Sequence, residues 1–127
     1  YFKAMKEAEA YPGPSLIIAY APCIAHGIKG GMNGTQDEEK MAVEAGYWSM
    51  YRFDPRLEEE GKNPFQVDSK EPDWNKSQSF LKNEVRYTSL LKAFPEQADI
   101  LFKLSEENAK RRHESYKRMA AMDFTTK

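Results

Sequence analysis

A cysteine and a histidine three residues apart are the side chains best suited to chemistry in this sequence. Cys23 and His26 lie in a glycine-rich stretch, and Cys23 is the only cysteine among the 127 residues. Three roles are open for its thiol: a small buried apolar group, a nucleophile whose pKa a nearby imidazole lowers, or a metal ligand. For an isolated cysteine, the inert buried role is the usual one. A single cysteine also excludes an intrachain disulfide and fits a reducing compartment.

The other candidates for chemistry have simpler explanations. His113 lies in a charged helical segment, which predicts a surface side chain. Gly27, Gly30 and Gly31 match neither the dinucleotide-binding nor the P-loop spacing, so these glycines indicate turns. Basic residues between 110 and 118 alternate with glutamates at helical distances, which predicts an ion-paired helix face. The net charge of -1 removes the global electrostatic case for nucleic-acid binding.

The elements before Cys23 follow an α/β pattern. Residues 1–10 have apolar side chains at helical spacing, and the Pro-Gly-Pro at 12–14 ends that helix. Ser15–Tyr20 is a short continuous apolar run, which predicts a strand buried on both faces of a parallel sheet. Cys23 follows this strand directly, where open α/β sheets place their ligands. One such unit cannot cover its own strand, so neighbouring strands must come from elsewhere.

A second helix and an aromatic run follow the cysteine loop. Thr35 and Glu38 have the spacing of a capping box at a helix start, and Gly46 can end that helix in the left-handed conformation. Residues 47–53 are rich in aromatics and are predicted to be extended. Aromatic residues at this density indicate core or domain-interface anchors more than a stacking surface for a nucleotide.

The rest of the chain is predicted to be a polar excursion followed by helices. Residues 54–75 contain several prolines and one short strand at 65–67. One helix is expected from about Ser77 to Ala93, and another from Pro95, which suits a first helical position. The second helix is expected to carry an apolar side made of Ala98, Leu101, Leu104, Ala109, Tyr116 and Met119.

Composition points to a cytoplasmic protein. The mean hydropathy is -0.80 and 31% of the residues are charged. The longest apolar run, residues 15–24, is much shorter than the about 20 residues that span a membrane. The first ten residues lack the continuous apolar stretch of a secretory signal. The chain does not begin with methionine, which fits a fragment that starts inside a longer polypeptide.

Several separated blocks of the sequence resemble one family in order and spacing. The run from Tyr11 to Gly27 resembles the last strand and following loop of the thiamine diphosphate domain in single-chain pyruvate:ferredoxin or flavodoxin oxidoreductases. The runs 46–48, 51–56 and 61–70 are similar to the segments that follow in that family. Separated blocks in the right order are more specific than one motif. After residue 70 the helical remainder is similar in character rather than in motif.

The resemblance implies a role for the cysteine loop. Cys23 would be the fourth thiolate ligand of the [4Fe–4S] cluster nearest the thiamine, and the other three cysteines would lie upstream. One cysteine cannot build such a cluster, so its other ligands must come from outside this chain. His26 would be a hydrogen-bonding neighbour that raises the reduction potential. Thiamine diphosphate and Mg²⁺ would bind mostly to upstream residues of the parent enzyme.

The resemblance also implies an α/β fragment, the last helix-strand unit of a thiamine diphosphate-binding domain, followed by a long loop and a mainly α-helical C-terminal region. Residues 1–53 would end the α/β domain and carry the cluster-ligand loop. Residues 54–75 would form an extended surface segment, and residues 76–127 a helical C-terminal extension.

The implied parent enzyme oxidatively decarboxylates pyruvate with coenzyme A to acetyl-CoA and CO2. Electrons would pass through clusters to ferredoxin or flavodoxin, and the parent is expected to be a homodimer. The fragment alone is expected to be inactive and to contain no catalytic residue. It is expected to bind neither nucleic acid nor a membrane. Two alternatives remain: a non-enzymatic helical interaction module, and a thiol-dependent enzyme that uses Cys23 and His26.

Overall fold

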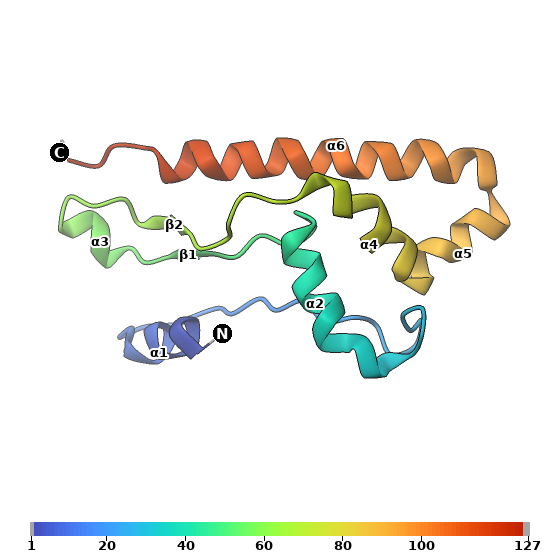
Figure 1. Ribbon diagram of the computed structural model, residues 1–127. Helices are drawn as coiled ribbons and strands as arrows, with labels where there is room; N and C mark the ends of the chain where they lie inside the picture. Colours follow the sequence, from blue (N-terminus) through green and yellow to red (C-terminus); the bar gives the residue numbers. More distant parts are fainter. Residues whose placement is uncertain (1, 126–127) are drawn as a thin grey trace.

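The computed structural model describes residues 2–125 as a mainly helical molecule with one small sheet (Figure 1). The helices are α1 (Phe2–Ala10), α2 (Thr35–Glu44), α3 (Arg56–Glu59), α4 (Ser77–Asn83), α5 (Val85–Ala93) and α6 (Pro95–Ala120). The strands are β1 (Tyr51–Phe53) and β2 (Phe65–Val67), and two 3₁₀ turns are η1 (Met32–Gly34) and η2 (Trp74–Lys76). Within residues 2–125, no helix is both long and apolar enough to cross a membrane. Tyr1, the expected first helical residue, lies outside the described residues.

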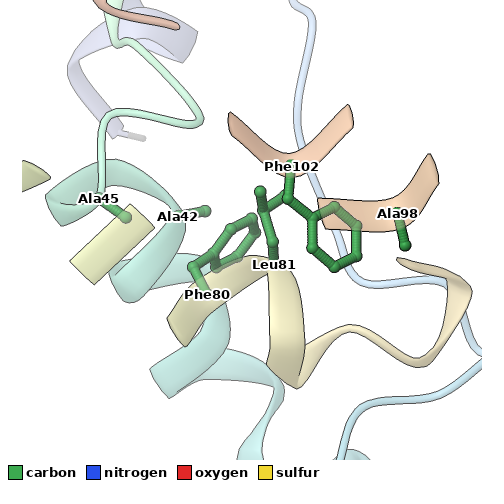
Figure 2. Packing of buried hydrophobic residues seen from close by; sticks show 6 residues of the cluster. All are labelled: Ala42, Ala45, Phe80, Leu81, Ala98 and Phe102. Carbon is green, nitrogen blue, oxygen red and sulfur yellow. The ribbon is translucent and has the colours of Figure 1, made fainter. Parts of the chain in front are cut away.

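The core lies where α2, α4 and α6 meet. Figure 2 shows the side chains of α4 between the other two helices, and the buried cluster consists of Ala42, Ala45, Phe80, Leu81, Ala98 and Phe102. Phe80 is fully buried, and Ala42 and Ala98 are also inaccessible. Alanines at the contact allow close approach of the helices around the larger Phe80 ring. Burying such a ring stabilises the fold by about 1.5–3 kcal/mol.

The long helix α6 begins at Pro95, as predicted, but its buried side differs from the predicted one. The residues of α6 that are buried are Ala98, Phe102, Ala109 and His113. Leu101, Leu104 and Met119 are between 42% and 48% exposed. The predicted apolar stripe is therefore wrong in part, because the helix offers two apolar sides and α4 covers the one with the small alanines.

The single helix predicted over Ser77–Ala93 is wrong, because the chain forms α4 and α5 with a break between them. Glu84 separates the two helices with extended backbone angles of φ -79° and ψ 116°. Its backbone forms an isolated antiparallel bridge with Ile28. A contact with a residue far away in the sequence thus replaces the helical hydrogen bonds at this position.

A short hairpin confirms the predicted strand at residues 65–67. The antiparallel register pairs Tyr51 with Val67, Arg52 with Gln66, and Phe53 with Phe65. Arg52 connects this hairpin to α1, because its Nη1 donates to Glu7 Oε1 and Oε2 at 2.7 and 2.6 Å, and its Nε donates to Asp68 Oδ2 at 2.6 Å. The hairpin therefore holds α1 near the rest of the chain.

The predicted extended aromatic run is confirmed only at its end. Tyr51 belongs to β1, and its ring lies 5.1 Å from the Phe65 ring and 5.0 Å from the Tyr116 ring of α6. Tyr47 and Trp48 are not in a strand, but both pack against the core cluster. The interpretation of these aromatics as core anchors therefore holds for the pair nearest α2.

The buried strand predicted over Ser15–Tyr20 is wrong for the described chain. This segment has no regular secondary structure, and Figure 1 shows it as part of the long connection from α1 to α2. Leu16 is 83% exposed and Ile18 is 64% exposed. A strand needs a neighbour that accepts its backbone hydrogen bonds, and residues 2–125 provide none for this run.

The start of α2 also differs from its prediction, whereas its end agrees with it. The Thr35 hydroxyl donates to the Met32 carbonyl at 2.6 Å, so no capping box forms. Glu38, its expected partner, is instead buried inside the molecule. Gly46 has a φ of +73°, as a helix end in the left-handed conformation requires.

Candidate functional site

The cysteine loop, residues 21–29, folds around the sulfur of Cys23. The Gly27 N–H donates to the Cys23 carbonyl at 2.8 Å and closes a tight turn. The same turn places His26 Nδ1 at 3.2 Å from Cys23 Sγ. Backbone N–H groups of Ala25 and His26 also donate to this sulfur. The predicted neighbours Cys23 and His26 are therefore in contact.

The loop favours the thiolate form of Cys23. The hydrogen bond from His26 and the backbone N–H groups of the turn together lower the pKa of the Cys23 thiol to about 7. Near neutral pH a large share of the thiol is therefore ionised, and the thiolate is the form that binds metals or attacks electrophiles. The thiol is partly exposed, which rules out the inert buried role.

His26 lacks the third group that an activated nucleophile usually has. Within residues 2–125, its second ring nitrogen, Nε2, has no hydrogen-bond partner. Thiol and hydroxyl nucleophiles work best when another side chain orients the base. The loop thus provides a lowered thiol pKa without an oriented catalytic dyad.

Two buried carboxylates lie close to the cysteine loop, and the sequence did not predict the burial of either one. Glu38 is 1% exposed, and its Oε2 accepts a hydrogen bond from Asn83 Nδ2. Glu84 is fully buried, and its Oε1 accepts a hydrogen bond from the Tyr20 hydroxyl. Burial and, to a lesser extent, the neighbouring Glu84 carboxylate raise the pKa of Glu38. The sequence predicted a helix-capping role for Glu38 and no role for Glu84, because the partners that bury them are 45 and 64 residues away.

His113 contradicts the prediction of a surface side chain. It is 3% exposed, its Nε2 lies 3.3 Å from Glu71 Oε2, and its ring lies 5.8 Å from the Trp74 ring. The polar excursion folds back over α6 at this point and covers the imidazole. Sequence patterns could not predict this contact, because the neighbours of His113 along the helix are charged.

The predicted ion-paired face of α6 is confirmed. Lys110 Nζ donates to Glu106 Oε1 at 2.6 Å, and Lys117 Nζ lies 3.3 Å from Glu114 Oε1. Arg112 donates to the Tyr47 carbonyl at 2.8 Å and ties the helix to the aromatic run. These basic side chains are satisfied by the chain itself.

Comparison with known proteins identifies the relatives of the chain. Pyruvate-flavodoxin oxidoreductase of Enterobacter agglomerans is 57% identical over 119 residues, which are 94% of this chain and 10% of that protein. Pyruvate:ferredoxin oxidoreductase of Moorella thermoacetica is 58% identical over 118 residues, which are 93% of this chain and 10% of that protein. The chain is homologous to one segment of the pyruvate:ferredoxin (flavodoxin) oxidoreductases.

A third relative carries a different electron acceptor in its name. Pyruvate dehydrogenase [NADP(+)], mitochondrial, of Euglena gracilis is 50% identical over 117 residues, which are 92% of this chain and 6% of that protein. No family model matches the chain. The chain spans about a tenth of the length, or less, of these curated relatives, so it corresponds to one segment of them. The resemblance predicted from the sequence is confirmed.

The cysteine loop offers one thiolate of the kind that binds iron in [4Fe–4S] clusters. The Cys23 sulfur is partly exposed and already accepts N–H groups, and iron ligands in such clusters are thiolates whose hydrogen bonds tune the potential. Residues 2–125 gather no three His, Cys, Asp or Glu side chains that could hold a metal ion. With one cysteine in the sequence, three further thiolates would have to come from outside it.

Proposed function

We propose that Cys23 supplies one thiolate ligand to a [4Fe–4S] cluster of a pyruvate:ferredoxin or flavodoxin oxidoreductase. The observation that carries the proposal is the accessible sulfur of Cys23, which accepts N–H groups of its own turn, in a segment homologous to these enzymes. A bound cluster of this type carries single electrons. The chain would hold this cluster through one bond and would need the rest of the parent polypeptide for the others.

Each residue of the loop has a distinct role in this proposal. Cys23 Sγ would bind iron as a thiolate, and its pKa of about 7 makes that form accessible near neutral pH. His26 Nδ1–H and the N–H groups of the turn would donate to the sulfur. Such hydrogen bonds withdraw electron density and stabilise the reduced cluster, so they would raise its reduction potential.

The reaction proposed for the parent enzyme follows from the same homology. Pyruvate and coenzyme A would give acetyl-CoA, CO2, two electrons and one proton, with thiamine diphosphate and Mg²⁺ supplying the carbon chemistry. The electrons would leave singly through clusters to ferredoxin or flavodoxin, and the parent would be a homodimer. The chain alone would be inactive, because the thiamine diphosphate site and the other cluster ligands would lie in the rest of the parent polypeptide.

The division of the chain into three parts is also proposed. Residues 1–53 would complete the thiamine diphosphate-binding domain, residues 54–75 would run over its surface, and residues 76–127 would form a helical extension. The exposure of Leu16 and Ile18 supports this division, because a sheet of the parent would bury both side chains.

Substitution of the proposed ligand in the parent enzyme tests the function. Cys23→Ala should remove the electron paramagnetic resonance signal of the cluster nearest the thiamine and reduce turnover with pyruvate by more than about 100-fold. Ile24→Ala is the matched control, because Ile24 is the adjacent residue and is 86% exposed. A normal signal and normal turnover in Cys23→Ala would refute the ligand assignment.

The distance of 3.2 Å between Cys23 Sγ and His26 Nδ1 favours a second candidate, a thiol-dependent enzyme. In that case the chain itself would form a covalent adduct with an electrophilic substrate. His26→Gln would then abolish the reaction while leaving iron binding in the parent intact. The missing partner on His26 Nε2 makes this candidate the weaker one.

A further inference from the structure

The junction between α4 and α5 holds the cysteine loop from its C-terminal side. The Lys29 N–H donates to the Asn83 carbonyl at 2.8 Å, and the Val85 N–H donates to the Gly27 carbonyl at 3.2 Å. Glu84 lies between these two bonds and forms the bridge with Ile28. The junction therefore fixes the backbone just after the turn that contains Cys23.

The same junction holds the loop from its N-terminal side through a side chain. The Tyr20 hydroxyl donates to Glu84 Oε1, and Tyr20 lies three residues before Cys23. The Tyr20 ring packs 5.6 Å from the Tyr47 ring and 6.3 Å from the Phe80 ring. One glutamate thus contacts the chain on both sides of the cysteine, at Tyr20 and at Ile28.

The position of Glu84 carries two costs in free energy, an interrupted helix and a buried carboxylate. These costs indicate that its contacts with Tyr20 and Ile28 are specific. Glu84 interrupts a helix that would otherwise continue, and its carboxylate is fully buried. Burying a charged or polar group destabilises a protein unless partners compensate it. The Tyr20 hydroxyl donates a hydrogen bond to Glu84 Oε1, whereas Glu84 Oε2 has only the ion pair with Arg86 Nε at 3.0 Å and accepts no hydrogen bond within the described residues.

We propose that Glu84 and Tyr20 are positioning residues that fix the cysteine loop and thereby set the direction of the Cys23 sulfur toward iron. The proposal rests on the proposed function of Cys23 as a cluster ligand. Apart from the packing of Pro22, which is buried, the residues between Tyr20 and Gly27 are held within the described chain by the Gly27 to Cys23 backbone bond and the contacts of the sulfur. Removing one anchor would therefore allow the whole turn to move.

Two tyrosine-to-phenylalanine variants of the parent enzyme separate positioning from general stability. Tyr20→Phe removes the hydroxyl that reaches Glu84 and keeps the packed ring. Tyr87→Phe is the matched control, because it removes a similarly part-buried hydroxyl, which lies 2.6 Å from the Tyr47 hydroxyl and does not contact the loop. Both variants lose one internal hydrogen bond, and the loss beside the buried Glu84 carboxylate is expected to cost more global stability than the loss between two hydroxyls. A purely structural role therefore predicts a change in the free energy of unfolding and no change confined to residues 21–29.

The measurements are hydrogen–deuterium exchange of residues 21–29 and the paramagnetic resonance spectrum of the cluster nearest the thiamine. Tyr20→Phe should speed exchange of the loop about tenfold, as expected for the loss of one hydrogen bond, and should alter the line shape of that cluster. Tyr87→Phe should leave both close to those of the unsubstituted enzyme. Equal exchange in the two variants would overturn the proposal. Faster exchange with an unaltered spectrum would overturn it too, because the anchors would then hold the loop without directing the ligand.

The result separates this proposal from the function on which it rests. Cys23→Ala, measured in parallel, reports whether the cysteine binds the cluster at all. Loss of the cluster in Cys23→Ala together with equal behaviour of the two tyrosine variants overturns positioning alone. Retention of the cluster in Cys23→Ala overturns the ligand assignment and, with it, this proposal, whatever the exchange rates are.

Discussion

The core around α4 and the segment before the cysteine loop differ in the solvent exposure of their apolar side chains. Phe80 and Phe102 are at most 4% exposed, because α2, α4 and α6 enclose them. Leu16 and Ile18 are 83% and 64% exposed. Both regions have the apolar residues of an interior, but residues 2–125 cover only one of them.

This difference shows which apolar side chains the described residues bury themselves and which would need other residues to bury them. Helices can bury their apolar sides against each other within a short chain, whereas a strand needs neighbours in a sheet. The cysteine loop lies between the two regions: its junction with α4 and α5 is internal, and the segment that leads into it is exposed. The following predictions test this comparison.

The largest effect is expected from truncating the core. Phe80→Ala should lower the free energy of unfolding by about 3–5 kcal/mol, because it leaves a cavity among α2, α4 and α6. Leu16→Ala, which removes a similarly apolar but exposed side chain, should change it by less than about 0.5 kcal/mol. Urea denaturation of the 127-residue chain measures both. Similar losses in the two variants would show that the exposed segment is packed in solution.

A smaller effect is expected at the glycine that ends α2. Gly46 has a φ of +73°, and a Cβ there would lie 2.5 Å from Trp74 Cζ3 and 2.7 Å from Cη2. Gly46→Ala should therefore cost about 2–4 kcal/mol through backbone strain and overpacking. Gly30→Ala controls for the backbone alone, because Gly30 has a φ of +90° and no atom within 4 Å of its Cβ position. Its expected cost is about 1–2 kcal/mol in the same denaturation experiment.

Removing the charge of Glu38 should change how stability depends on pH. Burial raises the pKa of Glu38, so the folded chain holds this proton more tightly than the unfolded chain. The stabilisation from this group is present at low pH and is lost as the pH rises through the folded-state value. Glu38→Gln should therefore gain stability relative to the unsubstituted chain between about pH 4 and about pH 8. Thermal unfolding at both pH values measures the gain, and a constant difference would contradict the assignment.

The smallest effect concerns reactivity and leaves the fold unchanged. The thiol of Cys23 in the iron-free chain should be alkylated with a midpoint near pH 7, since the His26 hydrogen bond and the N–H groups of the turn lower its pKa to about 7. His26→Gln should move that midpoint toward the value of an ordinary cysteine, about 8.5. Rates of iodoacetamide modification over a pH series provide the measurement. An unchanged midpoint in His26→Gln would show that the imidazole does not act on the sulfur.

Local signals in the sequence predicted the parts of the fold that depend on local physics. Pro95 fits a first helical position and begins α6, and Gly46 takes the left-handed conformation that ends α2. The contact between Cys23 and His26 could also be predicted from the sequence, because a spacing of three residues in a turn brings two side chains together. These features need no distant partner.

Distant contacts account for the parts that sequence patterns missed. The break at Glu84 depends on Tyr20 and Ile28, and the burial of His113 depends on Glu71 and Trp74. Helical periodicity carries no information about such pairs. The prediction of a strand over Ser15–Tyr20 was wrong for a related reason. An apolar run indicates that a segment suits a buried strand, but it does not show whether neighbouring strands are present.

Iron analysis of the parent enzyme tests the central claim most directly. If Cys23 is a cluster ligand, purified Cys23→Ala enzyme should contain about four fewer iron atoms per polypeptide than the Ile24→Ala control, because a [4Fe–4S] cluster lacking one of its thiolates is lost. Equal iron and sulfide contents in the two variants would contradict the claim.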